Sequence, residues 1–597
     1  MAEVAVSMPR QASPELTIRA VVTGMLIGAV LTPCNVYSGL KIGWTFNMSV
    51  AAGLIGFAFW TAAQKTFATP AYGLRENNIN QTTASSAASI ISAGLAAPIP
   101  ALALLTGQTL TFPVLALWMF VVSVLGVVVA AGMRNQLLFR ENLPFPSGVV
   151  TAETMREIHG GGEEAHARLR LLSITASISA MLKFVVSGFG VGQIGLPIKI
   201  AISPPVGAAA PTSVTAMNLG FALDPSLLMF GFGAISGIRI GVSALIGAVL
   251  GWGVLAPLAL QNGWVAPGDS NPDVVWFGSI VEWLLWPGVA LMVTASLTSF
   301  AISMLRMAIQ LRENQPPDPR IVRAGTIDRR KLIPAFLIAL VMCVAAQISI
   351  FGIGPLQAVI AVLLSYVLAI VSARVSGETG ITPIGALGKI TQLTFGAISP
   401  SNVTANLMTA NVTGGAAGQC ADLMHDLRTG QMIGATPGFQ VIAQLFGVLT
   451  GSLVAAITYL ALIPNPQAQL ITAEWPAPAV AIWKAVAEVM SGGVDAMPPA
   501  AWPAIAIASA TGVGLAIAER VTPQSLRRFI PSGSAIGLAF VIPAWNSISL
   551  FAGAFVTMLI ARLYPRWAER RLIVVAAGLI VGESLAGVAG AMVSILW

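Results

Sequence analysis

Polar side chains form three groups within otherwise apolar sequence. The first group follows Glu76 and runs from Asn77 to Thr83, and its candidate substrate-binding residues are Asn78, Asn80 and Gln81. Amide groups both donate and accept hydrogen bonds, as the binding of peptides and carboxylates requires. The alternative is helix packing, because small and hydroxylic residues let helices approach closely. Packing accounts better for the serines after Ala84 than for the amides before it.

The second group extends from Asn402 to Asp426, across glycines that predict a broken helix. Broken helices expose backbone groups, which are tolerated at depth only beside a cavity. The candidate substrate-binding residues are Asn402, Asn406, Asn411 and Gln419, and Asp422 is a candidate for proton coupling. Asp422 and Asp426 are one helical turn apart, with His425 beside the second. The alternative is a cytoplasmic loop from Asp422 to Arg428, and both interpretations stay open.

The third group consists of single residues that are isolated in apolar sequence. Polar and ionisable groups inside a membrane span are costly and usually mark a pathway or a proton relay. Three glutamates are candidates for proton coupling because burial favours the neutral form of a carboxyl group. The group comprises Glu141, Glu153, Glu378, Lys389, Asn546 and Glu583. Of these, Glu141, Glu378 and Glu583 are the candidates for protons, while Lys389 and Asn546 are candidates for substrate, as is Lys41 in similar apolar sequence. Glu378 also follows Arg374 by four residues, so a plain helical ion pair is the alternative there.

The elements that position these residues are membrane-spanning helices. No charged residue lies between Glu76 and Arg134 or between Lys331 and Arg374, and each of these stretches is long enough for two spans of about 20 residues. The turns are expected near Gly107 and at Gly352 to Pro355. Of 597 residues, 56% are hydrophobic and only 9% are charged. The fold class is therefore an all-α polytopic membrane protein with roughly 14 to 16 spans, some of them broken or re-entrant.

Basic residues predict the topology. Residues 306–331 hold seven basic and three acidic side chains, and such loops lie on the cytoplasmic side. We therefore expect a cytoplasmic N-terminus, a transmembrane half over 1–305, a linker over 306–331 and a second transmembrane half over 332–597. Lys41 and Lys389 occupy similar Gly-Leu-Lys-Ile-Gly and Leu-Gly-Lys-Ile-Thr contexts, and Pro-Ser-Gly at 146–148 recurs at 531–533. This paired order indicates internal duplication, a common plan in transporters.

Several classes of protein are disfavoured by what the sequence contains. The net charge of +7 is explained by cytoplasmic loops, so no nucleic-acid partner is expected. Residues 1–17 do not resemble a cleavable signal, and the three cysteines are expected to be packing residues. His159 and His166 are better explained by a solvated loop than by a metal site. No ATP-binding or hydrolase motif is present, and no cofactor is expected.

Five segments together resemble the oligopeptide transporter (OPT) family, which includes the yellow-stripe-like metal-chelate carriers. The resembling segments are Tyr37 to Trp44, Glu76 to Thr82, Arg140 to Gly148, Asn402 to Pro437 and Ile530 to Ser534. The resemblance implies twelve to sixteen transmembrane helices and inward, proton-coupled transport of small peptides or metal-chelating peptide-like compounds. It implies that Tyr37 is a further candidate substrate-binding residue. The resemblance assigns motif membership to the candidate residues and does not assign their individual roles.

The sequence thus predicts a proton-coupled secondary transporter that imports small oligopeptides across the cell membrane. Its expected partners are a peptide or metal-chelate substrate, protons and the lipid bilayer, while a homodimer is compatible with the sequence. Uptake of metal chelates or siderophores is the alternative within the same class. Two other classes stay open: an intramembrane enzyme built on Asp422, His425 and Asp426, and a passive channel.

Overall fold

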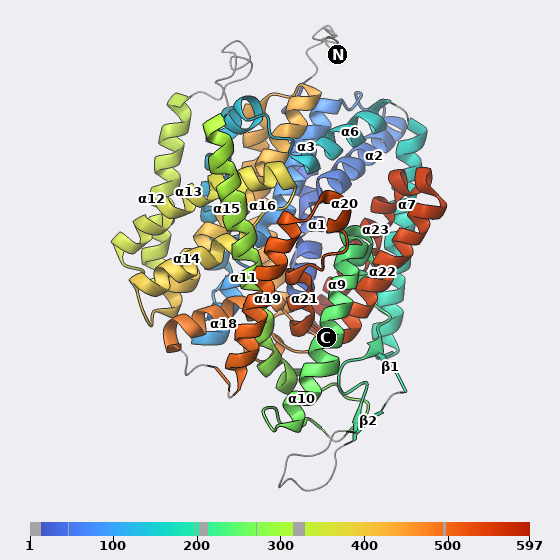
Figure 1. The fold of residues 1–597 in the computed structure, drawn as a ribbon. Helices are drawn as coiled ribbons and strands as arrows, with labels where there is room; N and C mark the ends of the chain where they lie inside the picture. Colours follow the sequence, from blue (N-terminus) through green and yellow to red (C-terminus); the bar gives the residue numbers. More distant parts are fainter. Residues whose placement is uncertain are drawn as a thin grey trace.

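The protein is a bundle of long helices with two small two-stranded sheets at one end (Figure 1). The computed structural model describes residues 14–43, 45, 47–160, 162–197, 199–201, 213–269, 271–313, 329–493, 497–498 and 500–596. Most of the predicted linker, residues 314–328, lies outside this part of the chain. The proposed boundary between the two halves therefore stays a prediction.

The first part of the chain holds α1 (Ile18–Ile42), α2 (Ser49–Phe67), α3 (Leu74–Ala88), η1 (Ser89–Ala93), α4 (Pro98–Thr106), α5 (Phe112–Arg134), η2 (Asn135–Arg140), α6 (Pro146–Gly160), α7 (Gly162–Gly188), α8 (Leu227–Ser236), α9 (Ile238–Ala248), η3 (Val249–Leu255), α10 (Ala256–Gln261) and α11 (Phe277–Glu313). Strand β1 (Ile194–Gly195) pairs antiparallel with β4 (Ala222–Leu223), and β2 (Lys199–Ala201) pairs antiparallel with β3 (Ser213–Thr215).

The second part holds α12 (Arg329–Phe351), α13 (Pro355–Thr379), α14 (Ile384–Ile398), α15 (Val403–Ile433), α16 (Pro437–Leu462), α17 (Pro466–Gln469), α18 (Pro478–Gly492), α19 (Ala501–Val521), α20 (Gln524–Arg527), α21 (Gly533–Val541), α22 (Ala544–Leu563) and α23 (Pro565–Leu596). Within the described residues, twelve helical segments are long and apolar enough to cross a membrane. The chain is therefore an all-α polytopic membrane protein.

Both charge-free stretches form the predicted pairs of spans. The first pair is Leu74–Thr106 and Phe112–Arg140, separated by a turn at Gly107, and the second is α12 and α13, separated by Gly352 to Gly354. Gly107 and Gly352 both have positive φ, at 71° and 63°. This backbone conformation favours glycine and ends each first span sharply.

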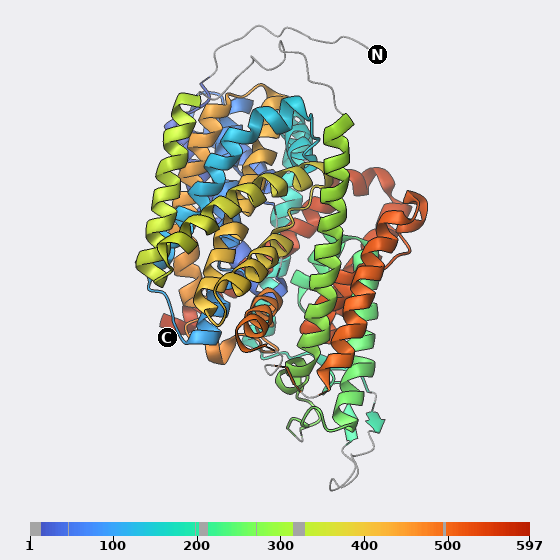
Figure 2. The same cartoon turned by 60° about the vertical axis from the view of Figure 1, so that its left-hand side comes forward.

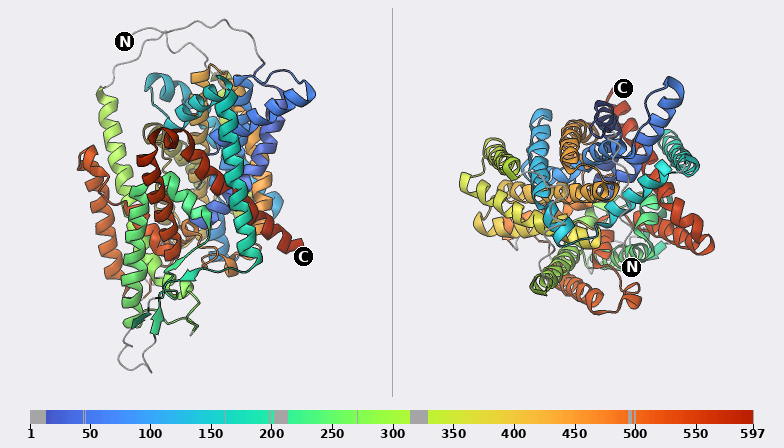
Figure 3. Two further views of the ribbon diagram at one scale, coloured as in Figure 1. Left: turned by 90° about the vertical axis from the view of Figure 1, so that its right-hand side faces the viewer. Right: turned by 90° about the horizontal axis from the view of Figure 1, so that it is seen from above.

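The two largest hydrophobic cores each include helices from both sides of residues 314–328. The larger core contains side chains of α1, α5, α12, α13, α15 and α16, and the smaller one packs α9, α10, α11 and α21 with part of α18 and α19. In Figure 2, α11 and α19 run side by side along one flank of the bundle. Figure 3 shows the strands at the end of the bundle toward which α7 runs.

Helix α15 corrects one prediction. The segment was expected to be broken at Gly414, Gly415 and Gly418, or to leave the membrane as a loop at Asp422, yet α15 is a single helix over 31 residues, Val403–Ile433. Its glycines allow close packing instead of a break. A Cβ atom on Gly415 would lie 2.5 Å from a methyl group of Val122 and 3.0 Å from the Cα atom of Ala93.

We therefore expect Gly415→Ala to lower the free energy of unfolding by about 1–3 kcal/mol, the usual cost of overpacking. Thermal unfolding in detergent measures this change. Gly132→Ala in α5 is the matched control, because a Cβ atom on Gly132 would meet nothing within 4 Å. Alanine there should be neutral or should stabilise the helix by up to about 1 kcal/mol. Similar melting temperatures for the two variants would contradict the packing role of Gly415.

Candidate functional site

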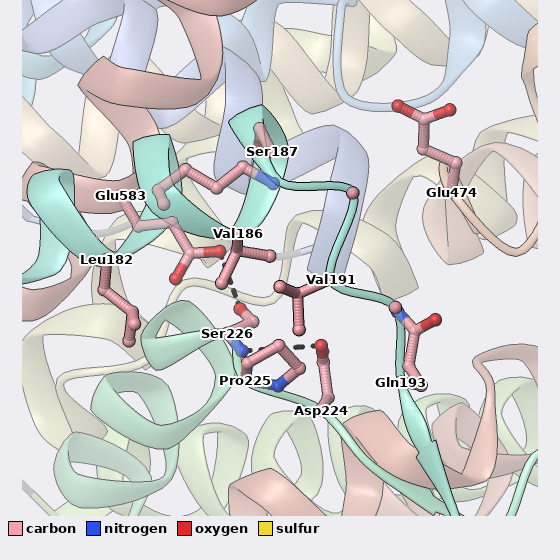
Figure 4. Close-up of a pocket in the computed structure, with 13 residues that line it drawn as sticks. Leu182, Val186, Ser187, Val191, Gln193, Asp224, Pro225, Ser226, Glu474 and Glu583 are labelled. Carbon is pink, nitrogen blue, oxygen red and sulfur yellow. Dashed lines mark hydrogen bonds between the residues drawn. The ribbon is translucent and has the colours of Figure 1, made fainter.

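A pocket of about 510 Å³ lies between the end of α7, the segment before α8, the α17–α18 connection and α23. Its charged lining residues are Lys183, Asp224, Glu474 and Glu583. Figure 4 shows the Glu583 carboxylate pointing toward Ser226, while Glu474 comes from a separate segment. The pocket therefore offers both charge signs to one molecule, and its volume is in the usual range for small-ligand sites.

Glu583 is fixed by the N-terminus of α8. One carboxylate oxygen accepts a hydrogen bond from the Ser226 hydroxyl at 2.6 Å, and the other accepts bonds at 2.7 Å from the backbone N–H groups of Leu227 and Leu228. These N–H groups have no partner within the helix, and a negative charge is stabilised at a helix N-terminus. Glu583 therefore links α23 to α8 at the pocket wall.

Lys41 and Tyr37, predicted from sequence, lie beside this pocket at the end of α1. The Lys41 ammonium donates to the backbone carbonyl of Glu474 and lies 4.7 Å from the ring centre of Trp475. The Tyr37 and Trp475 rings meet edge to face at 5.3 Å. Lys41 also interacts electrostatically with the four charged residues of the pocket, Lys183, Asp224, Glu474 and Glu583. An aromatic frame thus holds a second cation next to the pocket.

Asp224 makes the pocket sensitive to pH. Burial raises the pKa of Asp224 above its ordinary value, and the neighbouring Glu583 carboxylate raises that pKa further. As the pH falls, Asp224 takes up a proton earlier than an exposed aspartate does, and the pocket then loses a negative charge.

We expect wild-type affinity for a cationic amino group to weaken on acidification. Asp224→Asn should bind such a substrate about tenfold more weakly at neutral pH, because a charge-assisted contact contributes about 1.5–3 kcal/mol. Its affinity should also change less between neutral and mildly acidic pH. Equilibrium binding titrations of a labelled substrate test this, with Asp273→Asn, an exposed residue, as control. An unchanged pH profile in Asp224→Asn would exclude the role of Asp224.

A second polar region lies between α2, α3, α15 and α16, and we call it the polar seam. Gln81 of α3 donates to an Asp426 carboxylate oxygen at 2.6 Å, and Gln444 of α16 donates to Gln419 of α15 at 3.2 Å. Most of its side chains are buried almost completely. The polar seam comprises Ser49, Asn78, Gln81, Ser85, Gln419, Asp422, Asp426, Gln440 and Gln444.

Four predicted binding residues on α14 and α15 contribute hydrogen bonds within the helix packing. Asn402 caps α15 by accepting from the Ala405 N–H at 2.9 Å, Asn406 exchanges hydrogen bonds with Gln392, and Asn411 accepts from the Trp118 indole at 2.7 Å. Lys389 donates to the carbonyl of Gly385 in its own helix. Their binding roles stay predictions, although each amide or ammonium already has a protein partner.

The remaining predicted residues lie in separate places. Asn80 donates to the Ala52 carbonyl, and Asn546 is buried in the first turn of α22. Arg374 forms its ion pair with Glu141, at 2.5 Å, so the alternative Arg374–Glu378 pair is wrong. Glu378 is exposed. The histidine prediction also needs correction, because His159 ends α6 and contacts Asn77 at 3.2 Å instead of lying in a solvated loop.

Sequence reasoning missed four residues at the pocket: Lys183, Asp224, Ser226 and Glu474. A lysine within the apolar helix α7 was a visible signal for Lys183, because ionisable residues are rare inside spans. Asp224 and Ser226 precede a helix of only 10 residues, and Glu474 lies in a connection. Nothing in the sequence indicates that these segments meet.

Comparisons with known proteins relate this chain to transporters. The model of a family described as OPT oligopeptide transporter protein matches residues 15–315 and 325–593. A Saccharomyces cerevisiae protein with the name "Putative oligopeptide transporter" is 25% identical, with 96% of this chain and 95% of the yeast protein covered. An Arabidopsis thaliana metal-nicotianamine transporter is 23% identical, with 96% of this chain and 92% of the plant protein covered.

Proposed function

Because the chain belongs to the OPT oligopeptide transporter family, we propose that it is a proton-coupled secondary transporter that imports short oligopeptides across the cell membrane. The observation that carries the substrate proposal is the mixed charge of the pocket, with Lys183 among three carboxylates. A short peptide presents one ammonium and one carboxylate group. Asp224 and Glu474 suit the former, while Lys183 and the adjacent Lys41 suit the latter.

The membrane potential would supply energy for the proposed inward transport. With a membrane potential of 100 mV, each positive charge that moves inward contributes roughly 2.3 kcal/mol. One or two protons per peptide therefore suffice for a substantial concentration gradient. Glu583 is the proposed coupling residue at the pocket, because a proton on its carboxyl group would weaken the contacts that join α23 to the N-terminus of α8.

Uptake of metal chelates is the second candidate, and the name of the Arabidopsis relative favours it. Chelates of amino-acid-like compounds also present carboxylates, so the same lysines could bind them. Within the described residues, no three His, Cys, Asp or Glu side chains are grouped so that they could hold a metal ion. The protein would therefore recognise a chelate through its organic groups.

The test uses proteoliposomes that contain a pH-sensitive dye and are held at a fixed membrane potential. We expect tri- to pentapeptides to acidify the lumen and ferric or nickel chelates to have no effect. Acidification by chelates alone would replace the peptide proposal with metal acquisition. If neither class acidifies the lumen while a labelled peptide still enters, proton coupling would be wrong.

A further inference from the structure

The most unusual charged group outside the pocket is Asp426 in the polar seam. Its side chain is only 2% exposed, and no arginine or lysine forms an ion pair with it among the described residues. We propose that Asp426 is a proton-binding site that is loaded and emptied during transport. This inference rests on the proposed proton-coupled function and adds a site distinct from Glu583.

The hydrogen bonds of Asp426 leave one place for a proton. Gln81 and Ser49 both donate to Oδ1, at 2.6 and 3.2 Å, while Oδ2 has no hydrogen-bond partner. The Gln81 carbonyl oxygen is also buried without a partner. A proton on Oδ2 would convert this unpartnered oxygen into a hydroxyl group that can donate a hydrogen bond. It would also remove the large cost of keeping an isolated carboxylate out of water.

The Gln81 amide supports the same conclusion in both of its orientations. With its nitrogen toward Asp426, the amide stabilises the carboxylate form at Oδ1. Turned over, it would place its oxygen against Asp426, and this contact is favourable only if the carboxyl group is protonated. Rotation of one buried amide could therefore accompany loading and release of the proton, because the same pair can satisfy both states.

The surrounding seam contains an excess of acceptor atoms without partners. Besides Asp426 and Gln81, the carbonyl oxygens of Asn78 and Gln444 in the polar seam are buried and unpaired. Buried polar groups normally have partners, and each exception calls for an explanation. Transient protons or the water that carries them would supply the missing donors. The amide nitrogen of Asn78 is unpaired as well, so Asn78 could both donate a hydrogen bond to water and accept one from it.

The carboxylate of Asp422 favours one retained proton on the Asp422–Asp426 pair. On α15 itself, Asp422 lies one turn away and acts on Asp426 as a like charge. Two such carboxylates resist being ionised together, so one tends to keep a proton. The adjacent His425 bonds Ser376 of α13 at 2.9 Å. Asp422 is therefore a titratable neighbour whose own proton changes the electrostatic environment of Asp426.

The other helices bring little charge to Asp426. In α3, Glu76 is already paired with Arg19 at 2.5 Å, and α16 faces Asp426 with the neutral Gln440. In α6, Glu153 and Arg156 are exposed, and burial lowers the pKa of His159 to about 4, so that imidazole is neutral near pH 7. Asp426 therefore has no permanent counter-ion in this part of the chain.

The position of Asp426 separates it from the pocket. Gln81 lies about two turns from the start of α3, and Arg19, at the start of α1, pairs with Glu76 at that same end. Lys41 and the pocket lie at the opposite end of α1. A helix of 25 residues is about 37 Å long. Asp426 and Glu583 would therefore act as two protonation sites toward different faces of the membrane.

The first test replaces Asp426 by asparagine, which has the same shape and can still accept from Gln81 but cannot titrate. We expect Asp426→Asn to reduce peptide accumulation driven by a proton gradient about tenfold or more. Counterflow exchange at equal pH on both sides should stay within about twofold of wild type. Asp273→Asn, the same change at an exposed residue between α10 and α11, is the control and should leave both rates unchanged.

The second test needs no variant and remains valid if Asp426→Asn fails to fold. Dicyclohexylcarbodiimide is an apolar reagent that couples to protonated carboxyl groups, and mass spectrometry can locate the modification. We expect Asp426 in the full-length protein to be modified at mildly acidic pH and progressively less at alkaline pH. Addition of sodium chloride at constant pH should not protect it.

The outcomes separate the two proposals. If wild type shows no proton-driven uptake, the proposed function is wrong. If wild type is coupled but Asp426→Asn accumulates peptide as wild type does, the Asp426 site is wrong while coupling stands. Absence of modification at any pH would also overturn the Asp426 site. Protection by sodium would replace the proton with a metal cation at the same oxygens.

Discussion

Replacement of Lys41 by methionine should raise the KM for peptides about thirtyfold with little change in protein stability. Methionine keeps most of the apolar stem that packs against Tyr37 and Trp475 but removes the ammonium group. A charge-assisted hydrogen bond contributes about 1.5–3 kcal/mol, and 2 kcal/mol corresponds to roughly thirtyfold in affinity. Initial rates of labelled peptide uptake in proteoliposomes measure the KM.

The matched comparison is Lys389→Met, because both lysines follow similar sequence motifs. The Lys389 ammonium bonds Gly385 one turn before it and lies 5.8 Å from the ring centre of Trp483. We expect the KM of this variant to stay within about threefold of wild type. An equal rise in KM for both lysines would contradict the assignment of substrate binding to the pocket beside Lys41.

Replacement of Glu583 by glutamine should remove concentrative uptake while exchange continues. Loss of one coupled charge at 100 mV forfeits roughly 2.3 kcal/mol, which corresponds to about fiftyfold lower accumulation. Glutamine retains one oxygen that can accept from the N–H groups of Leu227 or Leu228, so the cap of α8 should lose only about 1 kcal/mol. Uptake driven by a proton gradient and counterflow at equal pH are the two measurements.

The comparison of these two rates decides the role of Glu583. Glu569→Gln, near the start of α23 and exposed, provides the control for loss of a carboxylate on the same helix. Equal loss of driven uptake and of counterflow in Glu583→Gln would show that Glu583 binds substrate or holds α8 in place without carrying the proton. Full driven uptake would remove Glu583 from the mechanism.

The helices were predictable where a single strong physical requirement applies. The charge-free stretches before Arg134 and Arg374 could only be spans, because the bilayer core excludes charge over a fixed thickness. Their turns at Gly107 and Gly352 were confirmed. The OPT motifs indicated the same family as the comparison did.

The predictions failed where tertiary contacts decide the outcome. Gly415 predicted a break in α15, but neighbouring Val122 and Ala93 occupy the space that a side chain would need. Arg374 had a partner four residues away in Glu378, yet Glu141 from a distant part of the chain pairs with it. Local spacing cannot reveal a competitor that only the fold brings close.

At the candidate sites, single residues could be predicted from the sequence but their clustering could not. Lys41 and Glu583 were identified individually, because ionisable groups stand out in apolar sequence, and Tyr37 was identified through the OPT-like segment that it begins. The structure brings Tyr37 and Lys41 beside the pocket that Glu583 lines. The three residues come from α1 and α23, at opposite ends of the chain. Their meeting, and the participation of Asp224 and Glu474, depend on helix packing that the sequence pattern does not encode.

The polarity of α15 also has a consequence for biogenesis. Although α15 contains 31 residues and is almost entirely buried, it is not among the twelve segments that are apolar enough to cross a membrane by composition. A polar helix partitions poorly into lipid during synthesis. Its partners α3 and α5 are made earlier, whereas α16 is made immediately afterwards. We therefore expect helix α15 to enter the bilayer together with neighbours that are already in place, so that its insertion and its tertiary folding are coupled.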